Sequence, residues 1–534
     1  MIEKANALKD MEYTKIINNL TLIKKPSVTN IPNALDMTIK TTSEYIEGMT
    51  KDERKKYGQF FTGKETAEYM ASLFDLDTPN IANKRKLTIL DPGAGTGILS
   101  IALIERLESY EYIKCIELTC YETDEKVLDI LRENLEFTKQ RSRIVINYKI
   151  ITENYITSQS NDFNHNNLLE DKESKKFDLI IGNPPYMKIG KDAPEALTMT
   201  EVCYGAPNMY FLFTAMSLFN LKADSEMVYI IPRSWTSGAY FKRFRKYLFK
   251  HGVLTNIHLF ISRNKVFNNE DVLQETIIIK VKKTTEKLEE IIISSSNSSN
   301  DFDDVTYLNV PYDLVISGEE YYVYLVTTEA EVDVLEALNK WTDTLPSLGL
   351  KMKTGLTVDF RNREVLRDEP EEGTMPFFYS QHIKDGKIQF PIGKEGEYIL
   401  TSKEGLLQLN KNYLFIKRFT AKEEKRRLQC GIYLASEYNE YEKISTHNKI
   451  NFIDKKDGSM SKELVYGLYV IFNSRIYDIY YRILNGSTQV NSTEVNNMPM
   501  PPINIIEEMG RELINSDNLT EETCNRIMEG YCGR

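Results

Sequence analysis

The sequence lacks long apolar runs, and no segment approaches the roughly 20 consecutive apolar residues that a helix needs to cross a bilayer. Its first residues, MIEKANALKDMEYTK, mix charges of both signs and lack the apolar stretch of a secretory signal. Hydrophobic residues make up 41% of the chain and charged residues 27%, as in ordinary globular proteins. We therefore expect a cytoplasmic protein without membrane contact, and its 534 residues suffice for two or three domains.

Cysteine and histidine are scarce and dispersed. The chain has five histidines, and its six cysteines form no CxxC pair and have no histidines nearby at the spacing of a zinc site. This scatter predicts reduced thiols in or near the cores, and no bound metal. The cysteines are Cys115, Cys120, Cys203, Cys430, Cys524 and Cys532.

Positive charge is also in deficit. The net charge of −11 excludes a protein coated in phosphate-binding charge. The basic residues are nevertheless concentrated: Arg233 to Lys250 holds six basic and no acidic residues, and Lys411 to Arg427 holds seven basic against two acidic. Such stripes suit a nucleic-acid groove, although a solvated helix face explains either stripe equally well.

Between Tyr57 and about Lys283, short apolar β-branched runs alternate with longer helical patterns. Several of these runs are apolar throughout, which is typical of parallel strands that are covered on both faces. The pattern predicts a doubly wound α/β domain with a mainly parallel sheet. The expected strands are 88–91, 116–122, 143–151, 177–183, 226–232, 255–260 and 275–281.

Changes in composition suggest the domain boundaries. Two segments rich in Ser, Asn and Asp, 158–176 and 294–304, are expected to be surface loops, and the second marks the expected end of the sheet. Beyond residue 345, short Tyr- and Phe-rich pieces with frequent glycines predict a mainly β domain, followed by a helix over 461–484 that ends at Asn485-Gly486. The expected parts are a helical extension (1–50), the α/β domain (51–285), a connecting segment (286–344), the β domain (345–505) and a tail (506–534).

A glycine-rich turn, Asp91-Pro92-Gly93-Ala94-Gly95-Thr96-Gly97, lies between a predicted strand and a predicted helix. Glycines at such a turn let the backbone approach a ligand closely. About 25 residues further on, at the end of the next strand, Glu122 can accept hydrogen bonds from both ribose hydroxyls of a nucleoside. The two features together predict a nucleoside site rather than a plain tight turn.

A second motif, Asn183-Pro184-Pro185-Tyr186, directly follows the predicted strand FDLIIG. Two prolines cannot continue a strand ladder, so they hold the chain rigid at the carboxyl edge of the sheet. That edge is where ligands bind in open α/β folds. The alternative, a rigid turn with a core tyrosine, is much less favoured once the glycine-rich turn is taken into account.

The pairing of DPGAGTG with NPPY resembles the amino-methyltransferases that use S-adenosylmethionine. The upstream segment GQFFTGKETAEYM (58–70) is similar to the extra cofactor motif of the gamma-class N6-adenine DNA methyltransferases of type II restriction-modification systems. Further patches of similarity extend to residue 502. The resemblance implies a Rossmann-like methyltransferase domain over 51–285 and a DNA target-recognition domain over 345–505.

The resemblance also implies roles for individual residues in binding S-adenosylmethionine. Thr62 and its neighbours would hold the methionine end, the glycine-rich turn would line the cofactor, and Glu122 would take the ribose. The family's Asp-Phe pair, which contacts the cofactor adenine, is replaced here by Glu153-Asn154-Tyr155, so Asn154 and Tyr155 are its expected substitutes. The expected cofactor residues are Phe61, Thr62, Asp91, Pro92, Gly93, Ala94, Gly95, Glu122, Thr123, Asn154, Tyr155 and Asn183.

Catalysis would need two neutral acceptors. The Asn183 side-chain oxygen and the Pro184 carbonyl can accept the two hydrogens of an adenine N6 amine and orient its nitrogen toward the sulfonium methyl. The target base must leave the duplex, and Tyr186 would stack on it. The resemblance places Phe267 on the other face, although an ordinary core aromatic remains an alternative for Phe267. The expected catalytic residues are Asn183, Pro184, Pro185 and Tyr186, and the expected DNA contacts are Tyr186, Phe267, Arg233, Lys417 and Arg418.

Two other functions remain open. The same NPPY site suits a glutamine or RNA amino-methyltransferase, although those enzymes are usually much shorter than this chain. The second is a catalytically silent nucleic-acid-binding module, which the two intact motifs disfavour. Cytosine C5 methylation is excluded because it needs a cysteine nucleophile and the chain has no Pro-Cys dipeptide. No PD-(D/E)xK arrangement occurs, so a restriction endonuclease, if one acts with this protein on duplex DNA, would be a separate protein.

Overall fold

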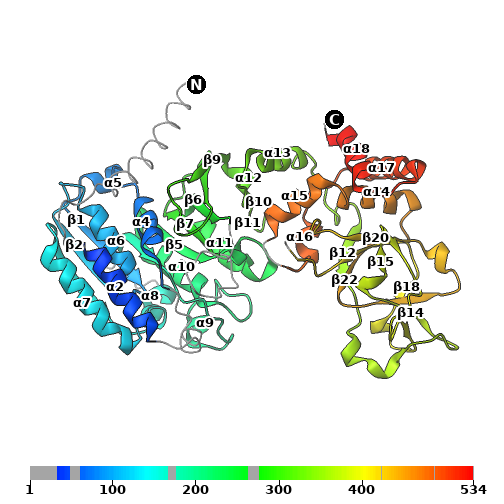
Figure 1. Ribbon diagram of the computed structural model, residues 1–534, viewed down its shortest axis with the longest axis horizontal. Helices are drawn as coiled ribbons and strands as arrows, with labels where there is room; N and C mark the ends of the chain where they lie inside the picture. The colour runs from blue at the N-terminus through cyan, green and yellow to red at the C-terminus, as the bar shows by residue number, and fades with distance from the viewer. Residues whose placement is uncertain are drawn as a thin grey trace. The chain divides into compact units, whose positions relative to one another are not determined.

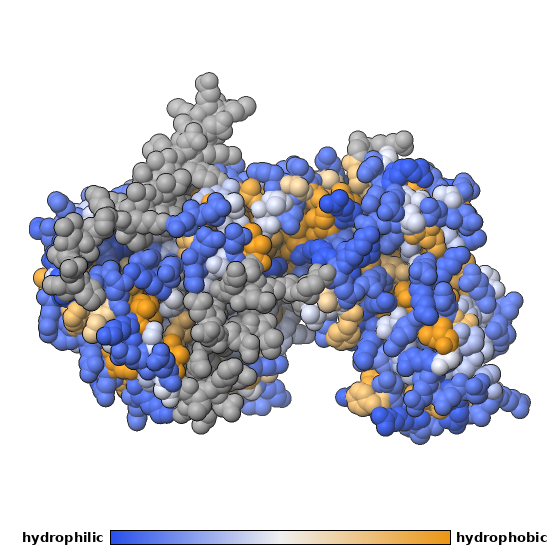
Figure 2. All heavy atoms as spheres, viewed as in Figure 1, coloured by the Kyte–Doolittle hydropathy of each residue, from blue (hydrophilic) through white to orange (hydrophobic). Residues whose placement is uncertain are grey.

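The computed structural model describes residues 33–48, 61–165, 176–261, 276–421, 424–485 and 488–532. The chain divides into two compact units (Figure 1). Unit 1 comprises Met1–Thr236 and Tyr240–Thr327, and unit 2 comprises Ser237–Ala239 and Thr328–Arg534. The segment 286–344, expected to connect two domains, is thus divided between the units at Thr327. Hydrophilic residues cover much of the visible surface of each unit (Figure 2).

Unit 1 is built on a nine-stranded sheet with the strand order β3-β2-β1-β4-β5-β7-β6-β8-β9. The first five strands in this order pair in parallel, and β7 is antiparallel to both β5 and β6. All seven predicted strands are confirmed. The strands are β1 Lys86–Pro92, β2 Cys115–Tyr121, β3 Val145–Ile151, β4 Phe177–Gly182, β5 Leu221–Pro232, β6 Val253–Phe260, β7 Thr276–Lys282, β8 Glu290–Ser296 and β9 Thr306–Pro311.

Helices pack around this sheet in two groups. Helices α2, α4, α6 and α7 contact one another, while α10 contacts β5 and α11. In α6 every residue from Ile98 to Ile104 is buried, which explains its almost wholly apolar sequence. The helices of unit 1 are α2 Ala34–Glu47, α4 Lys64–Ser72, α5 Pro79–Ala82, α6 Ile98–Leu107, α7 Glu125–Arg141, α8 Ser160–His165, α9 Pro194–Thr198, α10 Met209–Asn220, α11 Lys242–His251 and α12 Tyr312–Val315.

The prediction that 294–304 forms a surface loop is wrong for its first residues, because Ser294–Ser296 complete β8 and are buried. Their hydroxyls find partners inside the protein. The ring nitrogens of His258 lie 2.9 Å from Ser294 Oγ and 3.1 Å from Ser296 Oγ, and the Tyr69 hydroxyl lies 2.8 Å from Ser294 Oγ. Polar residues are therefore tolerated in this strand, and the sheet continues to Pro311. Similarly, part of the expected loop 158–176 forms α8.

Unit 2 is mainly β, as predicted. It contains a six-stranded sheet, β12-β22-β19-β20-β16-β15, and a five-stranded one, β13-β17-β14-β21-β18. Aromatic side chains dominate its core, with Phe378, Phe415 and Tyr433 fully buried. The strands are β12 Leu350–Thr354, β13 Leu366–Arg367, β14 Met375–Phe378, β15 Ile383–Lys384, β16 Lys387–Ile388, β17 Tyr398–Ile399, β18 Gln408–Leu409, β19 Tyr413–Lys417, β20 Cys430–Tyr433, β21 Lys443–Thr446 and β22 Ile450–Lys455; the short pair β10 Ile316–Ser317 and β11 Tyr322–Val323 belongs to unit 1.

The predicted helix over 461–484 is two helices, α14 and α15, which are separated at Asn473-Ser474. The Ser474 side chain caps α15 by accepting a hydrogen bond from the Tyr477 amide, so a new helix begins there. The expected tail over 506–534 is largely helical, because α17 and α18 pack on α14. The helices of unit 2 are α13 Glu329–Leu338, α14 Lys462–Phe472, α15 Arg475–Leu484, α16 Ser492–Asn496, α17 Ile503–Ser516 and α18 Glu521–Cys532.

Two features of the described ranges concern membranes and metals. None of the helices there is both long enough and apolar enough to span a membrane. Within the same ranges, no three His, Cys, Asp or Glu side chains are grouped so that they could hold a metal ion.

Candidate active site

The carboxyl ends of β1, β2, β3 and β4 meet at one edge of the sheet, because these strands run parallel. The glycine-rich turn follows β1, Glu122 follows β2, Asn154 follows β3, and Asn183 follows β4. The topology thus brings together four segments that are far apart in the sequence.

The glycine-rich turn depends on backbone conformations that only glycine adopts readily. Gly93, Gly95 and Gly97 have φ values of 80°, 55° and 91°. A Cβ atom at Gly97 would lie only 3.0 Å from a methyl group of Leu131. The amides of Gly93 and Ala94 donate to the Tyr121 carbonyl at 2.8 and 2.9 Å, which closes the turn against the end of β2.

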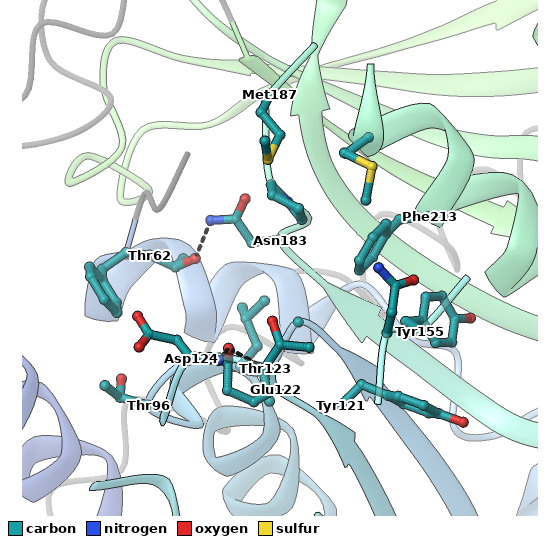
Figure 3. Close-up of a pocket in the computed structure, with 18 of the residues that line it drawn as sticks. Thr62, Thr96, Tyr121, Glu122, Thr123, Asp124, Tyr155, Asn183, Met187 and Phe213 are labelled. Carbon is teal, nitrogen blue, oxygen red and sulfur yellow. Dashed lines mark hydrogen bonds between the residues drawn. The ribbon is translucent and has the colours of Figure 1, made fainter. Parts of the chain in front are cut away.

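Glu122 fixes the turn from the neighbouring strand. One carboxylate oxygen accepts from the Gly95 amide at 2.8 Å, and the other accepts from the amides of Thr123 and Asp124, also at 2.8 Å (Figure 3). Burial raises the pKa of Glu122 above its ordinary value. Asp91 lies deeper: it is buried, it accepts from the Ser100 hydroxyl at 2.6 Å, and burial raises its pKa to about 7.

The N-terminal helix α2 supports the same turn. The hydroxyls of Thr42 and Thr96 lie 2.7 Å apart and both side chains are buried. The Asn134 side chain on α7 donates to the Thr96 carbonyl at 2.9 Å. The sequence contains no motif that marks Thr42, because this role depends on a contact over 54 residues.

Asn183 is held on two sides. Its amide nitrogen donates to Thr62 Oγ1 at 3.1 Å (Figure 3). Its Oδ1 lies 2.7 Å from the Tyr186 hydroxyl. The Tyr186 hydroxyl also lies 3.0 Å from the Ile230 carbonyl oxygen. The side chain of Tyr186 is buried, which raises the pKa of its phenol well above the ordinary value. The amide of Asn183 therefore has one fixed orientation.

A cavity of about 500 Å³ joins these groups. Most of the predicted cofactor residues line it, whereas Asp91, Pro92, Pro184 and Tyr186 are not among the residues that do so. The sequence motifs did not indicate several other lining residues, among them Tyr121, Glu195 and Phe213. The lining residues are Phe61, Thr62, Gly93, Ala94, Gly95, Thr96, Ile98, Leu99, Tyr121, Glu122, Thr123, Asp124, Glu153, Asn154, Tyr155, Asn183, Pro185, Met187, Glu195, Met209 and Phe213.

Aromatic rings form one wall of the cavity. The Tyr155 ring lies 4.9 Å from Tyr121 and 5.1 Å from Phe213, measured between centroids (Figure 3). The Tyr155 hydroxyl is directed to the interior, where it lies 2.9 Å from Ser217 Oγ and accepts from Asn220 at 3.1 Å. Tyr155 therefore presents an apolar ring to the cavity, as a planar ligand would require.

The predicted DNA contacts lie in several places. Arg233 is half-buried in a 3-10 turn, Arg233–Thr236, that follows β5. Lys417 ends β19, and the Arg418 guanidinium donates to the Asn448 carbonyl at 3.0 Å. Phe267 lies outside the described residues.

The basic stripe over 233–250 is only partly available to a ligand. Arg245 is fully buried: it donates to the carbonyls of Glu320 and Trp235 and lies over the Tyr322 ring. Lys242 pairs with the Glu320 carboxylate. The interpretation of this stripe as a continuous groove lining is wrong for Arg245, because its charge serves the fold of unit 1.

Known proteins resemble this chain in sequence and in fold. The model of the Eco57I restriction-modification methylase family matches residues 99–267. The type II methyltransferase M.BsuBI of Bacillus subtilis is 33% identical over 89% of this chain and 94% of its own length. For the type II methyltransferase M.PstI of Providencia stuartii the identity is 32%, over 91% of this chain and 95% of that protein.

Among solved structures, the type IIL restriction-modification enzyme MmeI in complex with DNA matches 97% of this chain and 75% of its own, with a TM-score of 0.50 and 14% identity. At that identity the likeness concerns the fold. It confirms the expected fold class, a Rossmann-like α/β domain followed by a mainly β part. Since M.BsuBI matches nearly the whole chain at 33% identity, this protein belongs to the type II methyltransferases of restriction-modification systems.

Proposed function

We propose that the protein is a site-specific DNA methyltransferase that transfers the methyl group of S-adenosylmethionine to the N6 amine of a flipped adenine. The observation that carries the proposal is the Asn183 amide, held between Thr62 and Tyr186 at the edge of a nucleoside-sized cavity. The membership of the chain in the type II methyltransferases supports it.

The cavity suits S-adenosylmethionine in size and chemistry. About 500 Å³ is within the range of small-molecule sites. Gly93 lines the cavity with a φ of 80°, and its lack of a side chain allows a ligand to approach the backbone closely. Glu122 Oε2, which accepts one hydrogen bond from the Gly95 amide, would accept a ribose hydroxyl, Tyr121 and Tyr155 would bound the base, and Thr62 would lie toward the methionine end. When bound, this cofactor supplies an electrophilic methyl group on a sulfonium.

The chain's contribution to the reaction is orientation and electrostatics. The lone pair of an adenine amine is delocalised into the ring, so the amine is a weak nucleophile until its hydrogens are held. Asn183 Oδ1, which lies 2.7 Å from the Tyr186 hydroxyl, would accept one N6 hydrogen. The Pro184 carbonyl would accept the second hydrogen. Both acceptors are neutral dipoles, and they stabilise the nitrogen more strongly as it becomes cationic.

After methyl transfer the nitrogen is cationic and loses a proton to water. No strong base is therefore needed in the site. Within the described residues that line the cavity there is no histidine and no cysteine. Pro185 keeps the backbone rigid, while Tyr186 and Phe267 would stack on the two faces of the extruded base, each contributing on the order of 1 to 3 kcal/mol.

Unit 2 would read the DNA sequence. Three of its segments, 350–363, 417–427 and 445–453, lie side by side: β12 and β19 both pair with β22, Thr357 forms a bridge with His447, and Arg418 bonds to Asn448. From 345 to 460 the chain has 20 Lys and Arg against 17 Asp and Glu, in contrast to the net −11 of the whole. This positive excess supports binding of duplex DNA through these segments, with Lys417 and Arg418 among the contacts.

A methyl-transfer assay tests the proposal. Purified protein would be incubated with tritiated S-adenosylmethionine and duplex DNA, RNA or a release-factor-like protein, and the methylated nucleosides would be separated by chromatography. We expect N6-methyladenine in DNA only, and its loss in Asn183→Ala. Methylation of RNA or of a glutamine amide would favour the other amino-methyltransferases, to which the match with type II methyltransferases over nearly the whole chain gives no support.

The role in the cell would be protection of host DNA against a restriction endonuclease encoded as a separate protein. Incubation of unmethylated DNA with this protein and magnesium should leave the DNA intact. Discrete fragments would contradict this part of the proposal.

A further inference from the structure

Asn154 follows the end of β3 and lines the cavity. In the structure the polar atoms of the Asn154 side chain are engaged. Its Oδ1 accepts from the amides of Ile156 at 3.0 Å and Thr157 at 3.1 Å, and its Nδ2 donates to Glu195 Oε1 at 2.8 Å. Because the two backbone amides occupy both lone pairs of Oδ1, Asn154 offers a ligand no acceptor.

Glu195 brings a carboxylate to the same place from a different part of the chain. It lies on α9, beyond the NPPY motif, and it lines the cavity together with Asn154. The side chain of Glu195 is half-buried. A carboxylate has about four lone-pair directions, so the bond from Asn154 leaves Glu195 with acceptor capacity.

The surroundings indicate which part of a nucleoside would meet Glu195. Since β2 and β3 are neighbours, a ligand whose ribose lies at Glu122 after β2 extends its base toward the end of β3. The rings of Tyr121, Tyr155 and Phe213 bound that end of the cavity. A purine packed against these rings would have its polar edge among the groups that follow β3.

We propose that Glu195 recognises the purine of the cofactor by accepting a hydrogen bond from its exocyclic 6-amino group, and that Asn154 positions the Glu195 carboxylate. This inference rests on the proposed function, because it concerns the S-adenosylmethionine site. The proposed carboxylate acceptor thus comes from α9, whereas Glu153 at the end of β3 is exposed. A cofactor without the amino group would leave the carboxylate without this donor, which is unfavourable in a half-buried site.

Calorimetric titration tests this assignment without measuring turnover. The full-length protein would be titrated with S-adenosylhomocysteine and with its 6-deamino analogue, which has hydrogen in place of the amino group. We expect the wild-type protein to bind S-adenosylhomocysteine more tightly than the analogue by on the order of 10-fold to 100-fold.

Glu195→Gln is the sharpest variant. The carbonyl of the substituted amide would keep the bond from Asn154, and its NH₂ group, a donor, would therefore turn toward the donor on the base. Affinity for S-adenosylhomocysteine should fall by on the order of 10-fold to 100-fold, whereas affinity for the analogue should change by less than about threefold, so the preference disappears. Glu195→Ala should also abolish the preference, and Asn154→Leu should reduce it by releasing the carboxylate.

Glu201→Gln is the matched control, because it removes an equal charge from an exposed residue of the same loop, and it should behave as wild type. Three results are decisive against the inference: retention of the preference in both Glu195 variants, loss of the preference in Glu153→Gln instead, or no preference in the wild type. Failure of the wild type to bind S-adenosylhomocysteine would overturn the proposed function as well, which separates the two failures.

Discussion

Asn183 shows how one side chain can be prepared for its task by two neighbours. An amide side chain has two nearly isosteric orientations, and only one of them presents an acceptor to an incoming amine. The donor role toward Thr62 and the acceptor role toward Tyr186 select that orientation before any substrate is present. The side-chain entropy is thus lost on folding, and the group needs no further ordering during the reaction that we propose.

Thr62→Val should test this arrangement. Valine has nearly the shape of threonine but cannot accept the Asn183 hydrogen bond, so the amide can rotate away from the productive orientation. We expect kcat to fall by on the order of 10-fold to 100-fold, and Thr62→Ser to restore most of it, because misplacement of a catalytic group costs about that much. Single-turnover methyl transfer to duplex DNA measures the effect. A Thr62→Val enzyme with wild-type kcat would show that the bond is incidental.

Asp91 should make stability depend on pH. Burial raises its pKa from 3.8 to about 7, so the folded state binds this proton more tightly than the unfolded state does. The stabilisation is complete below about pH 4 and is lost as the pH rises toward 7. Relative to Asp91→Asn, the free energy of unfolding of the wild type should decline over this window by up to about 4 kcal/mol, at about 1.4 kcal/mol per pKa unit. Urea unfolding of both proteins from pH 4 to pH 8 measures the difference, and parallel curves would contradict the prediction.

At the scale of elements, the crossing of α14 and α17 depends on two glycines. A Cβ at Gly467 would lie 1.8 Å from the Ile506 carbonyl oxygen, and one at Gly510 would lie 1.8 Å from the Glu463 carbonyl oxygen. Backbone atoms cannot move aside as a flexible side chain can. The helices therefore pack at a distance that no other residue allows.

Gly467→Ala should destabilise unit 2, because the helices must separate to accommodate the methyl group. We expect a loss of at least about 2 kcal/mol, since overpacking commonly costs 1 to 3 kcal/mol and here outweighs the gain in helix propensity. Gly530→Ala is the control: it lies in α18 with nothing within 4 Å of its Cβ, and it should be neutral or stabilise by up to about 1 kcal/mol. Equal effects in thermal unfolding would refute the role of the crossing.

The network around His258 joins β6, β8 and α4. His258 is buried, and burial lowers its pKa to about 3, so the imidazole is neutral at physiological pH. Replacing it with leucine removes one hydrogen-bond partner from each of the hydroxyls of Ser294 and Ser296, which keep the Tyr69 hydroxyl and the Ser298 carbonyl, respectively. We expect His258→Leu to cost about 1 to 3 kcal/mol in unfolding free energy. The triple variant that also carries Ser294→Ala and Ser296→Ala should recover part of this loss, and denaturant titration compares the two.

These elements also show what the sequence could predict and why. The seven strands from β1 to β7 could be predicted because their runs are rich in β-branched residues and several are apolar on both faces. The strand character of Ser294–Ser296 could not, because the partners of these hydroxyls, Tyr69 and His258, lie far away in the sequence. The break between α14 and α15 has a local signal in the capping serine, Ser474, but the apolar pattern on both sides concealed it.

At the scale of the whole molecule, the proposed cofactor site lies in unit 1 and the proposed DNA-binding segments lie in unit 2. The glycine-rich turn, Glu122 and Asn183 could be predicted to meet because the ends of parallel strands share one edge. Glu195 and Phe213 could not, since their place in the cavity depends on how the segments after β4 fold back. Likewise, the sequence could not indicate that Arg245 is buried rather than free to bind DNA.

Unit 2 offers a test of DNA binding that leaves the cofactor site untouched. Phe360 is 64% exposed. The exposed cations Arg361 and Arg363 follow it in the segment 350–363, and the exposed Lys449 lies in the segment 445–453. Replacing these three cations with alanine should weaken DNA binding at all sequences and lower the slope of log K against log salt by up to about 3, at about 0.9 per phosphate contact. Affinity for S-adenosylhomocysteine should be unchanged.

The matched control replaces three exposed lysines of unit 2 outside these segments, Lys384, Lys387 and Lys456. Fluorescence anisotropy with labelled duplex at several salt concentrations measures both variants. A control that loses as much affinity as the test variant would mean that net charge alone, rather than this surface, governs binding.

The locked amide of Asn183 has a consequence for the choice of base. Its oxygen and the neighbouring proline carbonyl sense only an NH₂ group on a ring, which cytosine carries at N4 just as adenine carries it at N6. In the reaction that we propose, these two acceptors alone therefore do not select adenine. Discrimination between the two nucleobases must come from other groups that contact the ring.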